Sequence, residues 1–145
     1  MQLLHAQAKR KDIGKLVFER SCFDVIHYDI EVKIKPSEKF ISGINAIEFK
    51  MLEASSKIQL DYSKSMNLDS AEYLGKPIVF KRKGNIVLFD FPGCLLKNSS
   101  HNLLLYFSGK PLEAKLAPWD GGFVWRKDNN GYDWVGLACE GLGAS

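Results

Sequence analysis

The chain has 145 residues, a formal net charge of +3, and contents of 46% hydrophobic and 26% charged residues. These values are typical of one soluble globular domain and exclude a disordered, collagen-like or coiled-coil chain. The basic residues are scattered apart from two three-residue runs, at 9–11 and 81–83, and no recognisable reading element accompanies them. We therefore expect no nucleic-acid partner.

Residues 1–22 form a polar leader with a weak helical pattern between Ala6 and Arg20. Ala6-Gln7-Ala8 has the small-residue spacing that signal peptidase recognises. Two interpretations stay open: a coincidence in a polar segment, or the remnant of a signal peptide that begins upstream. The location is accordingly open between the cytoplasm and the periplasm or exterior. No apolar stretch approaches the ~18 residues that a membrane span needs.

The first strand is predicted by a strict alternation of residue types. Apolar side chains occupy every second position, and polar or charged side chains lie between them. A period of two with β-branched residues on the apolar side indicates a strand with one wet face. We expect the apolar set to face inward: Ile26, Tyr28, Ile30, Val32 and Ile34.

The residues that follow continue as short strands and turns. Pro36 to Lys39 supplies a turn, and a second strand is expected at 40–51, where Gly43 and Asn45 favour a bulge or a close backbone approach. Further strands are predicted at 58–62, 68–74, 78–82, 86–91, 102–108, 123–127 and 132–136. Lys83-Gly84-Asn85 and residues 128–131 read as hairpin loops, because glycine and asparagine tolerate positive φ. The apolar run 103–107 lacks alternation, so both of its faces are expected to be covered.

Eight or nine short strands at near-regular spacing predict an all-β fold, either an antiparallel sandwich or a curved, saddle-shaped sheet, over 23–145. The three cysteines are an odd number without a C-x-x-C pair, which excludes a zinc ribbon or a thioredoxin-type motif. We interpret them as small buried or half-buried residues. They are Cys22, Cys94 and Cys139.

The sequence offers no catalytic residue and no metal site of its own. The three histidines are widely spaced, and no His-Glu-x-x-His occurs. One stretch, 118–127, is unusually rich in aromatic residues and glycine. The simpler interpretation is a hairpin whose Trp119, Phe123, Trp125 and Trp134 pack into the core, because large aromatic side chains mostly serve burial.

Several segments, in order, resemble the opening of the aminopeptidase N-type zinc metallopeptidases, the gluzincin aminopeptidases. They are FDVIHYDI at 23–30, ISG at 41–43, IQLD at 58–61 and YFSG at 106–109. The later segments WDGGFVW at 119–125 and CEGLGAS at 139–145 resemble a bacterial, Bacteroidetes-like branch of that family. The resemblance covers nearly all of 23–145.

The resemblance implies an N-terminal, saddle-shaped β domain that ends before the catalytic domain of the same polypeptide. In that family the following domain holds zinc through His-Glu-x-x-His and a further glutamate, and cleaves the first peptide bond of a peptide. This chain alone is therefore expected to need no cofactor and to be inactive. The family also places a Gln or Glu from this domain against the free α-amine of the peptide. Glu140 matches that position and is the predicted substrate-binding residue.

Two hypotheses follow. In the first, the chain is the non-catalytic domain of a zinc aminopeptidase, which contacts the catalytic domain and lines the pocket for the peptide substrate. In the second, it is a free-standing β-sandwich that binds protein or carbohydrate through exposed aromatic residues, with Trp119, Trp125 and Trp134 as the candidates.

Overall fold

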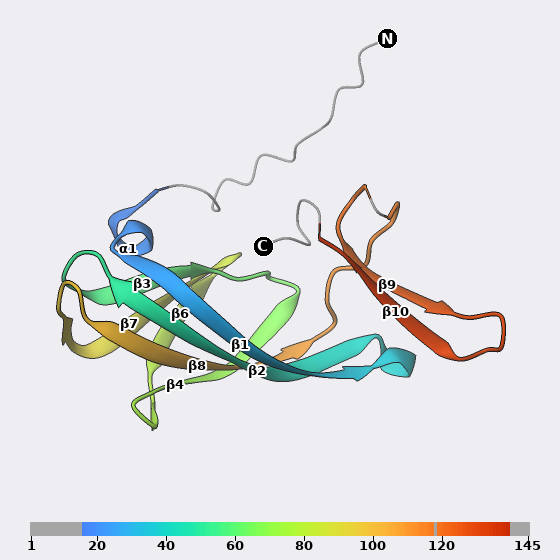
Figure 1. Cartoon of the computed structure of the whole chain (residues 1–145), viewed down its shortest axis with the longest axis horizontal. Helices are drawn as coiled ribbons and strands as arrows, with labels where there is room; N and C mark the ends of the chain where they lie inside the picture. Colours follow the sequence, from blue (N-terminus) through green and yellow to red (C-terminus); the bar gives the residue numbers. More distant parts are fainter. Residues whose placement is uncertain (1–15, 118, 140–145) are drawn as a thin grey trace, which may run out of the picture.

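Ten β-strands, one short α-helix and one 3-10 turn make up residues 16–117 and 119–139, the part of the chain that the computed structural model describes (Figure 1). The all-β prediction is confirmed. The elements are α1 (Phe18–Ser21), β1 (Phe23–Lys35), η1 (Pro36–Glu38), β2 (Phe40–Met51), β3 (Ser55–Asp61), β4 (Met66–Tyr73), β5 (Lys76–Pro77), β6 (Val79–Lys83), β7 (Ile86–Leu95), β8 (Ser100–Gly109), β9 (Gly122–Lys127) and β10 (Asp133–Ala138).

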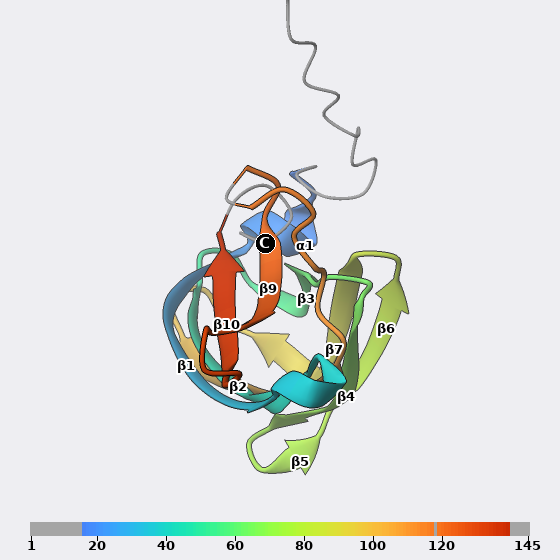
Figure 2. The ribbon, with the colours of Figure 1, turned by 90° about the vertical axis from the view of Figure 1, so that its right-hand side faces the viewer.

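The strands form three antiparallel sheets. The largest has the order β1-β2-β8-β4-β5, the second has the order β3-β7-β6, and β9 pairs with β10. Seen end-on in Figure 2, the five-stranded sheet curves from β1 on the left through β2 and β4 below, and β7 and β6 close the right side. The β9–β10 hairpin lies at the other end of the long axis from α1 (Figure 1).

Both predicted hairpins are present, and glycine makes each loop possible. Gly84 lies between β6 and β7 with a φ of 59°, and Gly131 lies between β9 and β10 with a φ of 85°. A side chain with a Cβ is disfavoured at such φ values. The loop positions were therefore readable from the residue types alone.

The core lies between the five-stranded and the three-stranded sheets. Phe49 of β2 and Phe89 of β7 are completely buried, as is Leu103 of β8. Aromatic contacts join the two layers: the ring of Phe91 lies 4.9 Å from that of Tyr73 and 6.1 Å from that of Phe49, measured between centroids. Packing of this kind contributes through both burial and edge-to-face contact.

The prediction that the apolar row of β1 faces a covered interior is wrong. All five side chains are between 42% and 55% exposed: Ile26, Tyr28, Ile30, Val32 and Ile34. Ile26 falls at a bulge, where the register against β2 shifts between Val25 and His27. An extra residue at a bulge is left out of the ladder.

The other four residues of the row do lie on the inner face. Tyr28 pairs with Ile47 of β2, which is buried, and directly paired residues share a face. The buried cluster takes in Phe23 and Val25 of β1, but none of residues 28–34. The second layer therefore covers the inner face of β2 and β8 more fully than that of β1, where residues 28–34 stay exposed even though Ile41, the partner of Ile34, is buried. We call this exposed part along β1 the uncovered half.

Gly43 of β2 pairs with Val32 of the uncovered half and shows the close backbone approach that the sequence suggested. A Cβ at this position would clash with the carbonyl oxygen of Glu31 and would lie 2.9 Å from the ring of Phe107. Glycine therefore allows β1 to run close against β2 here.

The apolar run of β8 differs from its prediction on one face. Leu103 and Leu105 are buried in the core, whereas Leu104 and Tyr106 are only half-buried. These outward side chains sit on a central strand, with β2 on one side and β4 on the other. Neighbours on the same sheet give them partial cover, and this suffices for an apolar run without a second layer.

The end of the leader is tied to the three-stranded sheet. The guanidinium of Arg20 in α1 makes two contacts to the carboxylate of Asp61 in β3, Nη1 to Oδ1 at 2.7 Å and Nη2 to Oδ2 at 2.5 Å. Cys22 is buried, and its carbonyl accepts hydrogen bonds from the amides of Leu52 and Glu53. Of the three thiols, only this one fits the expectation of burial, because Cys94 and Cys139 are exposed.

Candidate functional site

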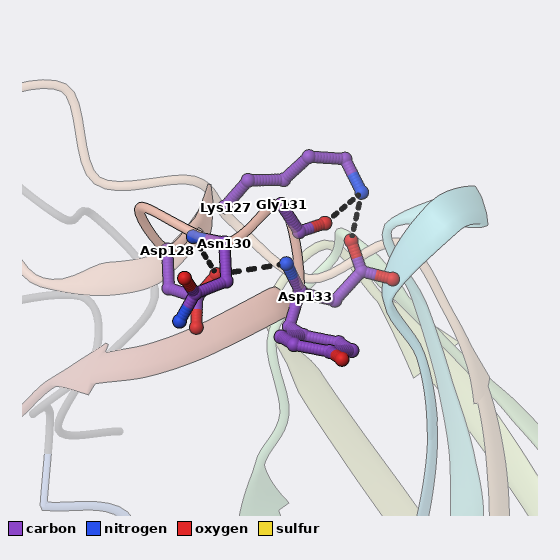
Figure 3. A network of polar contacts seen from close by, with 6 residues as sticks. Lys127, Asp128, Asn130, Gly131 and Asp133 are labelled. Atoms are coloured by element: carbon purple, nitrogen blue, oxygen red, sulfur yellow. Dashed lines mark hydrogen bonds and ion pairs between the residues drawn. The ribbon is translucent and has the colours of Figure 1, made fainter.

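The β9–β10 hairpin carries the aromatic stretch and leads into the segment where Glu140 lies. Its loop is built by Asp128 (Figure 3). The Oδ1 atom of Asp128 accepts hydrogen bonds from the amides of Asn130 at 2.9 Å and Tyr132 at 2.8 Å. The backbone amide of Asp128 donates to the carbonyl of Tyr132 at 2.8 Å. An aspartate side chain that accepts hydrogen bonds from the amides of its own loop fixes the turn without help from another strand or helix.

A lysine crosses from one strand of the hairpin to the other. The Nζ atom of Lys127 lies 2.9 Å from Oδ1 of Asp133, its direct cross-strand partner, and 3.3 Å from the carbonyl oxygen of Gly131 (Figure 3). This ion pair is exposed, so its contribution to stability is small. The ion pair favours the observed register instead, because it holds β9 and β10 in alignment at the point where the loop begins.

The hairpin is joined to the preceding segment by backbone contacts around Gly122. The amide of Phe123 donates to the carbonyl of Leu112 at 2.7 Å, and the amide of Ala114 donates to the carbonyl of Phe123 at 2.9 Å. A Cβ at Gly122 would lie 2.7 Å from the carbonyl oxygen of Leu112, so the close approach requires glycine.

The same segment is tied to the β1–β2 turn. Lys39 follows η1, and its Nζ lies 2.7 Å from Oε2 of Glu113, while β10 also contacts η1. The hairpin therefore sits beside the uncovered half of the five-stranded sheet (Figure 1).

The aromatic residues of the hairpin do not pack into the core, so the simpler sequence interpretation is wrong. Trp119 is 78% exposed and Trp134 is 53% exposed. Phe123 and Trp125 are half-buried and stack on each other, with ring centroids 5.4 Å apart. A two-stranded hairpin that extends beyond the three-stranded sheet has no second layer to bury its aromatic side chains.

These aromatic residues also do not form one binding platform. Trp125 pairs with Val135, and Trp134 pairs with Arg126, so the two indoles are one residue out of phase and belong to opposite faces of the hairpin. The ring of Trp134 folds back over Gly136, where a Cβ would lie 2.7 Å from the ring. Of the three candidate tryptophans, at least these two are not brought together.

Glu140, the predicted substrate-binding residue, lies outside the described residues. Strand β10 ends at Ala138, and the exposed Cys139 is the last described position. Within the described part of the chain, no group of three His, Cys, Asp or Glu side chains could hold a metal ion. None of its helices is long and apolar enough to cross a membrane.

A second site was not apparent from the sequence: a cavity of about 410 Å³, wide open to solvent, at the opposite end of the five-stranded sheet from η1. His101 is its central polar group. Its Nδ1 lies 2.8 Å from the hydroxyl of Tyr73, and its Nε2 lies 2.6 Å from Oγ of Ser99. The remaining walls come from the β4–β5 turn, the end of β7 and the turn that follows it: Leu74, Pro92, Gly93, Cys94, Leu95 and Leu96.

The hydrogen bonds of this cavity run in one direction. Oγ of Ser99 donates to the carbonyl of Leu96 at 2.5 Å, so it accepts from Nε2–H of His101, and Nδ1 of His101 then accepts from the hydroxyl of Tyr73. Burial lowers the pKa of His101, which favours this neutral form. Because the Ser99 hydroxyl donates its proton to a carbonyl, this series of hydrogen bonds does not activate Ser99 as a nucleophile. It fixes the β7–β8 turn.

The folded chain resembles zinc metallopeptidases of known structure. An M1 zinc metallopeptidase from Deinococcus radiodurans superposes with a TM-score of 0.61 and 21% identity, over 76% of this chain and 27% of that protein. A mutant of that enzyme bound to a Tyr-Ser-Ala substrate gives 0.60 and 21%, over 71% and 26%. Leukotriene A4 hydrolase from Saccharomyces cerevisiae gives 0.64 and 21%, over 84% and 20%.

At this level of identity the likeness establishes a shared fold. The chain spans about a fifth to a quarter of the length of these proteins. No family model matches the sequence. No curated protein matches it either.

Proposed function

We propose that this chain is the N-terminal, non-catalytic β domain of an aminopeptidase N-type zinc metallopeptidase. The observation that carries the proposal is the shared fold with M1 zinc metallopeptidases over most of the chain. The sequence segments that resemble this family support the proposal independently, because they follow one another in the family's order along nearly the whole chain. They are residues 23–30, 41–43, 58–61, 106–109, 119–125 and 139–145.

The zinc of such an enzyme belongs to the catalytic domain. When bound there, it activates a water molecule for attack on the first peptide bond. The contribution of this chain is then to present surfaces to the catalytic domain and to the amino terminus of the peptide. A substrate peptide carries an ammonium group at that terminus, which a carboxylate holds through a charge-assisted hydrogen bond.

The uncovered half of the inner face is the surface that we assign to the catalytic domain. Tyr28, Ile30, Val32 and Ile34 present a continuous apolar row there, and the hairpin lies beside it because Lys39 and η1 contact the hairpin and the segment before it. One partner domain could therefore cover the row and reach the end of β10 together. Apolar rows of this kind are characteristic of surfaces that a partner covers.

Glu140 is the residue of this chain that we assign to the substrate. In the sequence it follows the end of β10 by two positions, and its assignment rests on the resemblance of residues 139–145 to the family. In the longer enzyme, Glu140→Ala should raise KM and lower kcat/KM for peptides with a free amino terminus, by roughly ten- to a hundredfold, since one charge-assisted contact contributes about 1.5–3 kcal/mol.

Two variants control this experiment. Glu140→Gln should be milder, because an amide oxygen still accepts the ammonium hydrogen bond. Glu53→Ala removes an exposed carboxylate that pairs with Lys97, and it should leave the kinetics unchanged. Zinc content should equal that of the wild type in all three. Wild-type kinetics in Glu140→Ala would show that the residue is an ordinary loop carboxylate.

The free-standing binding module remains the second candidate, favoured by the exposure of Trp119 and Trp134. The coding sequence after Ser145 separates the two: an in-frame His-Glu-x-x-His supports the peptidase domain, and a stop codon supports the module. The 145-residue chain should also show no chelator-sensitive turnover of aminoacyl-fluorophore substrates with added zinc. Turnover well above a blank would contradict its assignment as a non-catalytic domain.

A further inference from the structure

Strand β1 has a long free edge. It is the terminal strand of the five-stranded sheet, and no other strand of the described residues pairs with its outer side. In Figure 2 it forms the outer left side of the ribbon. Its register against β2 is unbroken from His27 to Lys35, between the bulge at one end and Pro36 at the other. An open edge of this length is a template for a further strand.

The side chains along this edge form two patterns. On the polar face, two acidic residues, Asp29 and Glu31, precede two basic residues, Lys33 and Lys35, and all four are exposed. On the inner face the apolar row continues through the same segment. The acidic part of the polar face, at 29–31, is therefore complementary in charge to its basic part, at 33–35.

We propose that β1 pairs edge to edge with β1 of a second copy of the chain. In an antiparallel arrangement with the two-fold axis at Val32, Glu31 lies opposite Lys33 of the second copy, and Asp29 lies opposite Lys35 of the second copy. By symmetry, four opposite-charge pairs form. On the inner face, Ile30 meets Ile34 of the second copy, and Val32 meets its own counterpart. Directly opposed pairs of these two kinds stabilise a sheet.

The charge pattern selects this register over its neighbours. Registers that differ by one residue place apolar side chains opposite charged ones. A shift of two residues puts Glu31 opposite Glu31, or Lys33 opposite Lys33, on the two-fold axis. Like charges directly opposite each other destabilise a sheet. Pro36 has no amide hydrogen to donate, so the paired segment ends at Asp29 and Lys35.

The other edges of the two larger sheets do not offer the same surface. Strand β6 presents exposed Lys81 and Lys83, which would face like charges in an antiparallel self-pairing. Strand β3 packs against α1, and β5 has two residues. Among the described residues, Lys35 is the one of the four charged side chains at 29–35 of β1 with a competing ion pair, an exposed contact to Glu38 at 3.4 Å, and such a pair is easily exchanged.

The proposed dimer uses the outer edge of β1, whereas the proposed function uses its inner face and Glu140. Neither rests on the other. The edge pairing leaves the inner face of both copies open and joins their apolar rows across the two-fold axis.

The oligomeric state of the 145-residue chain tests the proposal, by analytical ultracentrifugation from about 10 µM to about 1 mM, the range suited to a weak interface. We expect a reversible dimer. Glu31→Lys and Lys33→Glu should each weaken it about tenfold, because each turns two attractive pairs into repulsive ones. The double variant Glu31→Lys/Lys33→Glu should restore it to within about threefold of the wild type.

Lys81→Glu on β6 is the matched control for Lys33→Glu, with the same change in net charge on another exposed edge strand, and it should leave the dimer constant unchanged. A chain that stays monomeric across the range, or a double variant as weak as either single variant, would overturn the proposal.

Cross-linking tests the register independently. With Cys94 and Cys139 replaced by serine, Val32→Cys should form a disulfide-linked dimer on mild oxidation, because this position meets itself on the two-fold axis within disulfide reach. Ile30→Cys should not, since its counterpart lies about 13 Å along the sheet. Equal yields at both positions, or none at Val32→Cys, would overturn the register.

Discussion

Strands β1 and β2 of the five-stranded sheet have a similar pattern of alternating residues and different surroundings. In β2, inner-face residues such as Ile47 and Phe49 are almost fully buried. In the edge strand β1, Tyr28, Ile30 and Val32 lie on the same face and are about half exposed. Alternation specifies which side chains share a face. Whether that face is covered depends on a second layer that the alternation of one strand does not encode.

The covering layer should respond most strongly to mutation. Phe89→Ala removes a completely buried ring of β7 that packs between the two sheets, and we expect it to lower the free energy of unfolding by about 3–5 kcal/mol. Trp134→Ala removes a larger ring from the exposed face of the hairpin and should cost less than about 1 kcal/mol. Urea denaturation measures both. Equal losses would mean that the hairpin is part of the core.

The uncovered half should still have strict local requirements, although it is open to solvent. Gly43→Ala places a Cβ against the backbone of β1 at Glu31 and the ring of Phe107, and should destabilise the domain by about 1–3 kcal/mol. Gly93→Ala in β7 is the control, because a Cβ there meets no atom within 4 Å, and it should change stability by less than about 1 kcal/mol. A tolerated Gly43→Ala would show that β1 and β2 can move apart.

The smallest expected effect is a pH dependence at the covered end. Burial lowers the pKa of His101, so the folded state binds the proton less readily than the unfolded state. Titration of His101 therefore leaves the free energy of unfolding unchanged above the unfolded pKa of about 6.5. It lowers that free energy as the pH falls through this value toward the lowered folded pKa. The limit for one proton is about 1.4 kcal/mol per pH unit.

The difference between the wild type and His101→Phe isolates this term. Between about pH 7.5 and 5.5, the wild type should lose stability more steeply than the variant in chemical denaturation, whatever the variant costs overall. Parallel pH profiles would contradict the role of His101.

Much of the fold could be predicted because its signals are local. Alternation located the long strands, and Gly84 and Gly131 marked the hairpin loops through their positive φ. The contact of His101 with Tyr73 joins residues 28 positions apart, so no local pattern could reveal it. The sequence could not decide whether Trp119 and Trp134 are buried, as the core interpretation expects, or exposed, as the binding-module hypothesis expects. An aromatic residue type gives the amount of apolar surface but not the position of a second layer.

The candidate site was predictable only through resemblance. Asp128 could be read as a loop residue, but nothing in its neighbourhood indicates a substrate. Glu140 has no local signal of binding, since a single carboxylate after a strand is common, and its assignment depends on the family motif around it. Chemistry that two domains share cannot be derived from the residues of one of them.

The division of the inner face is tested most directly by one substitution made on both sides of it. Ile47 and Ile30 lie on adjacent strands and on the same face, buried and exposed respectively. In the isolated chain, Ile47→Asp should lower the free energy of unfolding by several kcal/mol, since it buries an unpaired carboxylate, whereas Ile30→Asp should lower it by less than about 1 kcal/mol. Similar losses at the two positions would mean that β1 is covered, and would contradict the account of an inner face that is left open along β1.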